Sequence, residues 1–211
     1  MTTKELHGIY HELNFWQGFV KTKRFLDGWV SHKKTPELND LVAEFIKSVP
    51  HDKVADIGSG VCSILNGLVD VEPFDPLGDL YGIVFDYKAH KVTQPKPYPA
   101  EELPYNSEFD IVHCSNAIDH TQSPMLAYSK MWDALKPAGN LIIQGFENEG
   151  TFENWQGFHQ HDIYVESETL CIKNKMGNMA VIDTKPKHLH FVEFEAKRWY
   201  IWIKQKSWFS A

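Results

Sequence analysis

Two glycines directly follow a short, mainly apolar segment in the first third of the chain. Residues 54–57 are apolar apart from Asp56, and the sequence then reads Gly58-Ser59-Gly60. Glycine tolerates positive φ and lets the backbone approach a ligand closely, so this pattern predicts a strand ending in a ligand-facing turn. Asp75 comes 19 residues after Asp56, which suits an acid that hydrogen-bonds ribose hydroxyls at the end of the next strand. The turn and the acid together predict a nucleoside-containing cofactor.

This pattern is compatible with two cofactors, NAD and S-adenosylmethionine. The dinucleotide pattern has a glycine at its sixth position, where this chain has Ser63, so a pyrophosphate would meet an unsuitable turn. Asp56 lies two residues before Gly58, where a carboxylate can bind a cationic amino group such as that of S-adenosylmethionine. The residues therefore favour S-adenosylmethionine.

Two polar segments are candidates for the reactive centre, because ligands bind at the carboxyl ends of parallel strands. The first is 116–120, Asn-Ala-Ile-Asp-His, and the second begins at 147–150 and continues to Asp162. Histidine suits a base near neutral pH. We expect His159 or His120 to remove a proton, with Glu149 orienting the base or binding the acceptor. A helix cap or a packing role is the alternative for either histidine.

His159, His161 and Asp162 also carry atoms that bind metals. Their spacing is loose for a zinc site and a partner from another strand is missing. We therefore expect a surface loop at this place, and no metal.

The elements that would position these residues alternate between helix and strand. Apolar spacing predicts a helix at 9–30, and Thr35 and Pro36 predict the start of a second one that ends before Pro50. The following elements are expected in this order: strand 53–57, helix 63–68, strand 69–74, a loop over 86–100, strand 109–114, helix 124–135 and strand 140–146. This alternation predicts a parallel sheet with helices on its faces.

The last third of the chain has a different pattern. Residues 170–183 read as a hairpin around Gly177-Asn178, and 190–204 as two aromatic strands around Ala196-Lys197-Arg198. Antiparallel strands are thus expected to complete the sheet. Their aromatic residues are expected to pack in the protein, with a homodimer interface as the alternative.

Composition narrows the class of partner. Hydrophobic residues make up 43% of the 211 residues and the formal net charge is -7, which predicts a folded protein and disfavours nucleic acid. Three cysteines without a CxxC pair suit a reducing compartment. No apolar segment is long enough for a membrane span, so we expect a cytoplasmic protein without a membrane partner.

The order of motifs resembles that of class I, type-11-like S-adenosylmethionine-dependent methyltransferases. Residues 56–60 resemble the first motif of that family, Asp75 its ribose-binding acid, 100–105 the segment beside the adenine, and 109–116 the strand lining the methionine part. The segment 135–141 resembles the family's Lys-Pro-Gly-Gly turn, with Ala138 in place of one glycine. Two further departures are Cys62 in place of a third glycine and Pro99 in place of an adenine-binding acid.

The resemblance implies a set of cofactor contacts. They are expected at Asp56, Gly58, Ser59, Gly60, Asp75, Pro76, Leu77, Glu101, Glu102, Cys114, Ser115 and Asn116.

It also implies a Rossmann-like α/β sandwich, with a mostly parallel central sheet, antiparallel C-terminal strands and N-terminal helices. One domain, 1–211, would comprise an N-terminal helical lid (1–49), in which Tyr10 and Trp16 pack or touch substrate, a cofactor-binding core (50–147), and an acceptor loop with the C-terminal strands (148–211).

The polar segments at 116–120 and 157–161 resemble a narrower subgroup that carries Asn-Ala-Leu-Asp-His and Gly-Leu-His-Gln-Trp, which we associate with surface glycans. The expected activity is therefore O-methylation of a small hydroxylated acceptor, a sugar or a glycan. A non-catalytic module with the S-adenosylmethionine-binding fold that binds a partner, or less favourably a NAD-dependent oxidoreductase, is the alternative.

Overall fold

The computed structural model describes residues 3–31, 37–194 and 196–207. Within them, a central sheet has six strands in the order β2-β1-β3-β4-β9-β8. The strands are β1 Val54–Ile57, β2 Glu72–Phe74, β3 Phe109–Ser115, β4 Leu135–Phe146, β8 His188–Phe194 and β9 Lys197–Gln205. Strands β1 to β4 pair in parallel, whereas β9 is antiparallel to both β4 and β8. This confirms the expected sheet.

The register brings the carboxyl ends of the parallel strands to one edge. Ile57, at the end of β1, is opposite both Phe74 and Cys114, and Cys114 is opposite Ile143 of β4. The residues that follow these strands therefore lie at the edge where parallel sheets bind ligands.

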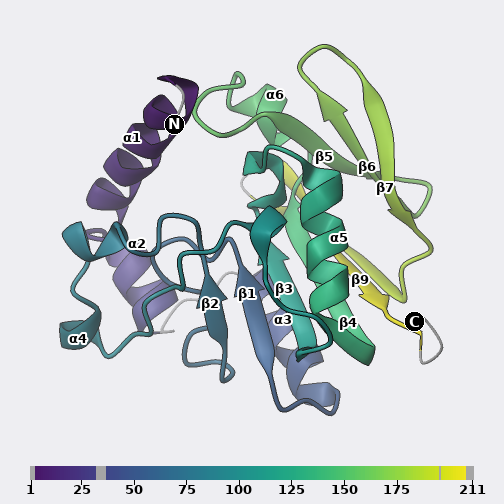
Figure 1. The fold of residues 1–211 in the computed structure, drawn as a ribbon, viewed down its shortest axis with the longest axis horizontal. Helices are drawn as coiled ribbons and strands as arrows, with labels where there is room; N and C mark the ends of the chain where they lie inside the picture. Colours follow the sequence, from purple (N-terminus) through teal and green to yellow (C-terminus); the bar gives the residue numbers. More distant parts are fainter. Residues whose placement is uncertain (1–2, 32–36, 195, 208–211) are drawn as a thin grey trace.

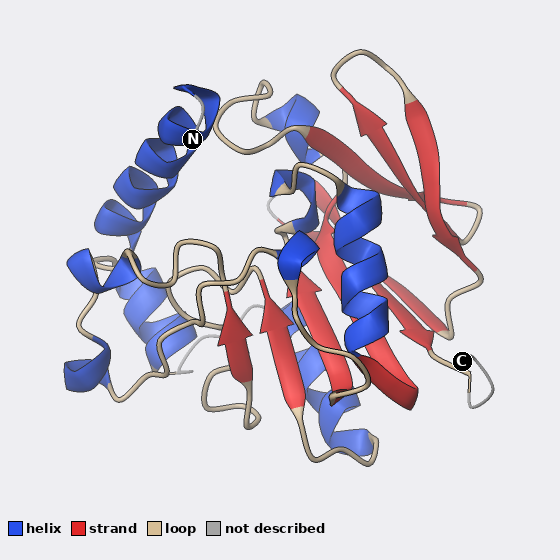
Figure 2. Cartoon of the chain, in the orientation of Figure 1, coloured by secondary structure: helices blue, strands red, loops and turns tan. Residues whose placement is uncertain are grey.

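Helices cover both faces of the sheet, with α5 on one and α3 on the other (Figures 1 and 2). The α-helices are α1 Thr3–Phe19, α2 Lys23–Phe25, α3 Glu37–Ser48, α4 Tyr87–His90, α5 Pro124–Ala134 and α6 Glu149–Phe152. A π-helical turn spans Leu26–Val30, and 3-10 turns span Tyr81–Ile83, Ala100–Glu102 and Ile118–His120.

The alternation of side chains along β3 builds a separate core on each face. Ile111 packs with Val42 and Ile46 of α3, and its neighbour Val112 packs with Met131 of α5. Successive side chains of a strand point to opposite faces. Central strands buried on both faces therefore read as continuous apolar segments.

A second sheet is built from the segment between β4 and β8. It has the order β5-β6-β7, with β5 His161–Glu166, β6 Thr169–Asn174 and β7 Met179–Thr184. Its inner residues Ile163, Leu170 and Ile182 belong to the core cluster around α5. In Figure 1 this second sheet lies above and to the right of α5. The hairpin at Gly177-Asn178 is confirmed as the β6–β7 turn, but it lies outside the central sheet, and β5 was not expected.

The prediction of one helix over 9–30 is wrong. Helix α1 begins at Thr3 and ends at Phe19, and Thr22 then adopts an extended conformation. Its hydroxyl accepts a hydrogen bond from the Phe25 amide at 3.2 Å, so Thr22 caps a new helical segment. The second predicted helix is confirmed as α3, whereas its expected cap at Thr35 and Pro36 lies outside the described residues.

The predicted helix over 63–68 is also wrong, because the segment forms turns. Ser63 Oγ accepts the Leu65 amide at 3.1 Å, and Gly67 adopts φ 73°, which a helix does not allow. The strand that follows is only Glu72–Phe74 instead of 69–74. Strand β4 is longer than expected, since its pairing with β3 begins at Leu135.

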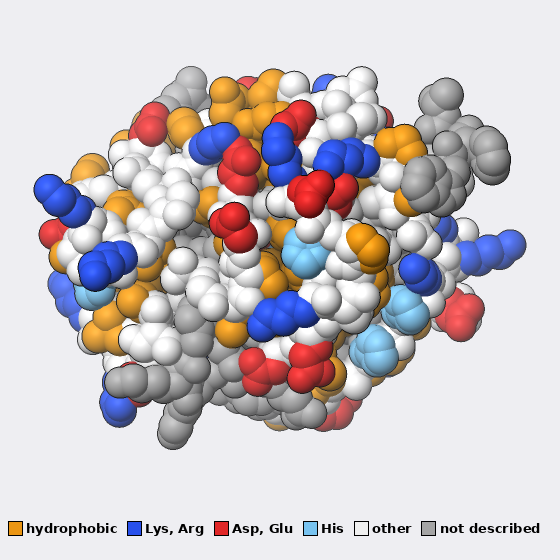
Figure 3. All heavy atoms as spheres, turned by 90° about the horizontal axis from the view of Figure 1, so that it is seen from below, with side chains coloured by type: hydrophobic (Ala, Val, Ile, Leu, Met, Phe, Trp, Pro, Cys, Tyr) orange, Lys and Arg blue, Asp and Glu red, His pale blue; other side chains and the backbone are white. Residues whose placement is uncertain are grey.

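Ion pairs join the elements at the opposite, amino-terminal edge. Lys53 pairs with Glu108, and Lys136 Nζ lies 2.9 Å from Asp110 Oδ2. The face shown in Figure 3 carries acidic and basic side chains next to one another. Among the described helices, none has the length and apolar character needed to cross a bilayer.

Replacing Ile111 by alanine tests the two-faced core. Ile111 is fully buried, and Ile→Ala changes at such sites cost about 2–5 kcal/mol of unfolding free energy. We expect the urea midpoint of Ile111→Ala to fall accordingly. The matched control is Ile83→Ala, because Ile83 is 77% exposed. Equal losses in both variants would contradict the assignment of β3 to the core.

Candidate active site

A cavity of about 720 Å³ lies at the carboxyl edge of the central sheet. The residues expected at the cofactor that line it are Gly58, Asp75, Pro76, Leu77, Glu101, Glu102 and Cys114. The others expected there, which are not part of its wall, are Asp56, Ser59, Gly60, Ser115 and Asn116. Of the catalytic candidates, His120 lines the cavity, whereas His159 and Glu149 do not.

The turn after β1 is fixed by three backbone amides. The amides of Gly58 and Ser59 donate to the Phe74 carbonyl at 2.8 and 3.0 Å, and the Gly60 amide donates to Asp75 Oδ2 at 3.0 Å. Gly58 and Gly60 have φ of 71° and 62°, where a side chain is strained. A Cβ on Gly58 would also stand 2.3 Å from the Ala117 Cβ.

Asp75 is held rigidly at the cavity wall. Its second oxygen accepts the Leu77 amide at 2.9 Å. Burial raises the pKa of Asp75 to about 6, although hydrogen bonds from Leu77, Tyr81 and Gly60 lower it. Three of the about four acceptor sites of this carboxylate are used, which leaves one for a hydroxyl donor.

The segment from Pro99 to Glu102 forms another part of the wall. Glu101 Oε1 accepts the amides of Gln122 and Ser123, at 2.8 and 3.2 Å. This oxygen therefore supports the start of α5.

Asp56 is buried beneath the turn. Its carboxylate accepts a hydrogen bond from Ser63 Oγ at 2.5 Å and contacts His113 Nδ1 at 2.7 Å. Ser63, whose presence disfavoured NAD, thus has a structural partner in Asp56. Both Asp56 oxygens have partners within the protein, so the geometry assigns Asp56 to the support of the turn rather than to the cavity wall.

Cys62, at the place of the family's third glycine, is buried behind the turn. Burial raises the pKa of its thiol to about 12, and Sγ lies 3.7 Å from the Trp29 carbonyl. The bulkier residue is accommodated by packing toward the π-helical turn. All three cysteines are free and buried.

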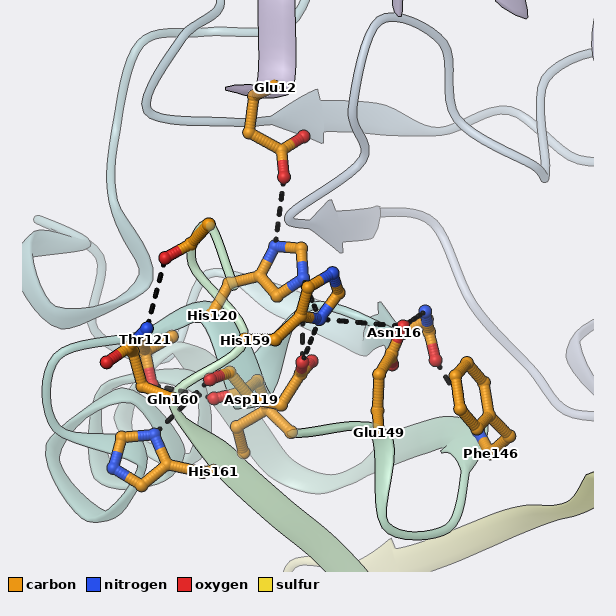
Figure 4. A network of polar contacts seen from close by, with 12 residues as sticks. Glu12, Asn116, Asp119, His120, Thr121, Phe146, Glu149, His159, Gln160 and His161 are labelled. Atoms are coloured by element: carbon orange, nitrogen blue, oxygen red, sulfur yellow. Dashed lines mark hydrogen bonds and ion pairs between the residues drawn. The ribbon is translucent and has the colours of Figure 1, made fainter. Parts of the chain in front are cut away.

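A polar cluster stands next to the cavity, at the ends of β3 and β4 (Figure 4). His159 Nδ1 lies 2.9 Å from both His120 Nε2 and Asp119 Oδ2. Glu149 Oε1 is 3.7 Å from His159 Nδ1. The structure thus brings the three predicted catalytic residues together, and adds Asp119.

Backbone contacts hold the loop that carries His159. The Gln160 amide donates to the Asp119 carbonyl at 3.2 Å, and His161 Nδ1 is 3.2 Å from the same oxygen. Asp162 lies apart from the cluster, where it accepts hydrogen bonds from Thr151. Of the three residues whose spacing was weighed for a metal, only His159 belongs to the cluster.

Asn116 connects the ends of the two strands. Its Nδ2 donates to Glu149 Oε1 at 2.8 Å, and its Oδ1 accepts the Phe146 amide at 3.4 Å. Ser115 Oγ accepts from Gln144 at 2.9 Å. Asn116 therefore positions Glu149.

Burial and neighbouring charges shift the pKa values of two residues of the cluster, Glu149 and His159. Burial raises the pKa of Glu149 well above its usual value, and the negative charge of Asp119 raises it further. Burial by itself would lower the pKa of His159, but the hydrogen bond and charge of Asp119 outweigh this and raise it. A proton is therefore favoured within this cluster.

Helix α1 borders the cavity from the other side. Ile9 and Glu12 line it, and Glu12 Oε1 lies 3.7 Å from His120 Nδ1. Trp16 packs on Gly60, where a Cβ would come within 2.2 Å of its ring, whereas Tyr10 is 67% exposed.

Sequence reasoning did not single out Asp119 or Glu12 as site residues. Asp119 could have been predicted from the sequence, because it lies in the polar segment 116–120. Glu12 could not, because only the tertiary contact between α1 and the turn Ile118–His120 brings it to His120.

The comparisons with known proteins agree with this geometry. Residues 55–143 match the family model described as a methyltransferase domain. No curated protein matches the chain in sequence.

Solved structures resemble the whole chain at low identity. The N-methyltransferase NodS from Bradyrhizobium japonicum, in complex with S-adenosylhomocysteine, is 11% identical at a TM-score of 0.58, over 94% of this chain and 98% of that one. The cyclase SpnF has a TM-score of 0.58 and 12% identity over 98% and 96% of the two chains. The 1,6-didemethyltoxoflavin-N1-methyltransferase of Burkholderia thailandensis has a TM-score of 0.50 and 14% identity over 95% and 90%.

The central sheet, its ligand-binding edge and the matched segment define a class I methyltransferase fold. Residues 55–143 of the chain are similar in sequence to a methyltransferase domain, and the solved structures share its fold.

Gly58→Ala tests the turn as part of the cofactor site. The new Cβ would meet Ala117 and strain the backbone, so the wall of the cavity must shift. We expect S-adenosylhomocysteine to bind at least about tenfold more weakly by calorimetry, which corresponds to about 1.4 kcal/mol. Gly18→Ala is the control, because it lies in α1 with open space around it. Unchanged affinity in Gly58→Ala would exclude the turn from the site.

Proposed function

We propose that this enzyme transfers the methyl group of S-adenosylmethionine to a hydroxyl of a small acceptor, a sugar or a glycan. The observation that carries the proposal is the position of the polar cluster of Asp119, His120, Glu149 and His159. One member of it, His120, lines the same cavity as Gly58 and Asp75.

In this proposal each part of the cavity wall binds one part of the cofactor. Asp75 accepts the ribose hydroxyls, and the segment from Pro99 to Glu102 lies beside the adenine. Cys114 lines the methionine end, with Ser115 and Asn116 behind it. Asp56 holds the turn through Ser63 and His113 and acts on the cofactor only through that turn.

The cluster favours oxygen over nitrogen as the methyl acceptor. In the transfer, the sulfur–carbon bond breaks, an oxygen–carbon bond forms, and the hydroxyl proton must leave. A neutral amine has a free lone pair and needs no base before attack, whereas a hydroxyl gains from one. His120 is the member of the cluster that lines the cavity, so it accepts this proton, and the Asp119 carboxylate 3.5 Å from its Nε2 stabilises the imidazolium that forms.

The size of the cavity favours a small acceptor. Pockets for small molecules usually measure about 300–1,000 Å³, and this cavity of about 720 Å³ must hold the cofactor as well. A glycan would therefore enter by a single sugar unit. The net charge of -7 further disfavours nucleic acid.

Asp75→Asn tests the ribose contact. Burial raises the pKa of Asp75 to about 6, so the carboxylate is charged above that pH and protonated below it. The wild type should bind S-adenosylhomocysteine well at pH 8 and lose affinity as the pH falls through 6. Loss of a charged hydrogen bond should weaken binding by Asp75→Asn about 10- to 100-fold at pH 8 and leave it nearly independent of pH. Calorimetry at several pH values measures both effects.

The matched control is Asp79→Asn, because Asp79 is exposed on the same loop. A pH profile of Asp75→Asn that follows the wild type would assign the titration to another group.

His120→Ala tests the proton transfer. Radiolabelled S-adenosylmethionine is mixed with a panel of monosaccharides and nucleotide sugars, and with amines of similar size. We expect methylation of a hydroxylated acceptor, and a loss in kcat of about 100-fold or more in His120→Ala. Binding of S-adenosylhomocysteine should change little.

His190→Ala serves as the control, since His190 is exposed on β8. Turnover with amines alone would contradict O-methylation, and cofactor binding without any turnover would favour the non-catalytic alternative.

A further inference from the structure

Four side chains from three segments point one donor atom each at a common centre (Figure 4). They are Asp119 and His120 from the 3-10 turn after β3, Glu149 from α6, and His159 from the loop that follows α6. Their donor atoms all lie within 4.8 Å of one another. Two imidazoles and two carboxylates are donor types that bind divalent transition metals.

Four separations within this group are close to the edge length of a metal polyhedron. Zinc ligands at about 2.0–2.1 Å in a tetrahedron stand roughly 3.3 Å apart. Here, His159 Nδ1 is 2.9 Å from both His120 Nε2 and Asp119 Oδ2. Asp119 Oδ2 is 3.5 Å from His120 Nε2, and His159 Nδ1 is 3.7 Å from Glu149 Oε1.

His159 Nδ1 lies between two polar partners, His120 Nε2 and Asp119 Oδ2, which must share the available protons. His159 Nδ1 can hold one proton. If that proton is donated to Asp119, the nitrogen has no lone pair left to accept a hydrogen bond from His120 Nε2. If it instead accepts from His120, it turns a lone pair toward the carboxylate. A cation at the centre would be attracted to all these lone pairs at once.

Charge leads to the same conclusion. Asp119 is 3% exposed and Glu149 is 5% exposed, so ionising both side chains, instead of keeping a proton on Glu149, would place two negative charges where water has little access. Buried charges are costly unless they are paired or coordinate a metal. A divalent cation would balance both.

Neighbouring residues contact His120, Glu149 and the backbone of Asp119. Glu12 Oε1 stands 3.7 Å behind His120, on the Nδ1 side of the ring, and Asn116 Nδ2 donates to Glu149 Oε1. The carbonyl of Asp119 receives the Gln160 amide and faces His161. Carboxylates and amides in such outer positions hold metal-binding histidines and carboxylates in place.

We propose that Asp119, His120, Glu149 and His159 bind a divalent transition-metal cation, Zn²⁺ or Mn²⁺, at the acceptor end of the cavity. This differs from the sequence expectation of no metal, which weighed His161 and Asp162 instead of Asp119 and Glu149. Imidazole nitrogens favour this class of cation over Mg²⁺ and Ca²⁺.

The catalytic role of the cation rests on the proposed function. In a fifth coordination position, the cation would hold the acceptor hydroxyl and lower its pKa. With the cation bound, His120 would be a ligand instead of the proton acceptor, and the hydroxyl proton would leave to Glu12, which also lines the cavity. The oxygen–carbon bond forms as the sulfur–carbon bond breaks.

The test is metal binding by the full-length protein, stripped with a chelator and titrated separately with Zn²⁺, Mn²⁺ and Mg²⁺. We expect one equivalent of Zn²⁺ or Mn²⁺ per chain, much weaker binding of Mg²⁺, and visible absorption bands of low-symmetry Co²⁺ after cobalt substitution. His159→Ala should weaken binding at least about 100-fold and remove the cobalt bands. The matched control His190→Ala should bind like the wild type.

Binding of S-adenosylhomocysteine checks the fold of His159→Ala, because His159 does not line the cavity. Equal metal binding by His159→Ala and the wild type, or no stoichiometric binding by a folded wild type, would overturn the proposal. Methyl transfer to a hydroxyl that persists in the chelator would overturn the metal's role and leave the proposed function standing. Metal binding without methylation of any hydroxyl would overturn the proposed function and leave the proposed metal site standing.

Discussion

The short turn after β1 is the constraint on which the rest of this site depends. Three consecutive amides, from Gly58 to Gly60, are used to bind the end of β2 and the Asp75 carboxylate. This fixes the distance between the first two strands and places Asp75 at the cavity wall. Below the turn, Asp56 is held between Ser63 and His113. Both oxygens of the Asp56 carboxylate thus have a hydrogen-bond partner beneath the turn, which holds the turn in place.

The parallel register extends this constraint across the sheet. Because β3 and β4 run parallel to β1 and extend only slightly past its end, the residues that follow them meet at the same edge. Asn116, directly after β3, joins the end of β3 to the end of β4, because it donates a hydrogen bond to Glu149 and accepts one from the Phe146 amide. The polar cluster therefore has its place set by the sheet.

The segment between β4 and β8 both positions His159 and adds a second sheet to the core. Its first part, up to His161, brings His159 onto Asp119, and its second part folds into the β5-β6-β7 sheet that packs on α5. The hydrogen bond from Tyr128 of α5 to Asp183 of β7 joins that sheet to the core. The loop that carries His159 is thus tied at both ends to buried structure, which limits how far His159 can move.

The sequence by itself determined the parallel core, because strands buried on both faces read as apolar segments and glycines at required positive φ are visible in the chain. It also indicated the cofactor class, Asp75, and the two segments that carry His120, Glu149 and His159. Only the tertiary structure decided that Asp119 joins them, that Glu12 lies behind His120, and that Asp56 supports the turn. The helix expected at 63–68 was lost because Ser63 uses its hydroxyl for Asp56 and Leu65. Local propensity describes one segment at a time, whereas these roles arise from contacts between segments far apart in the chain.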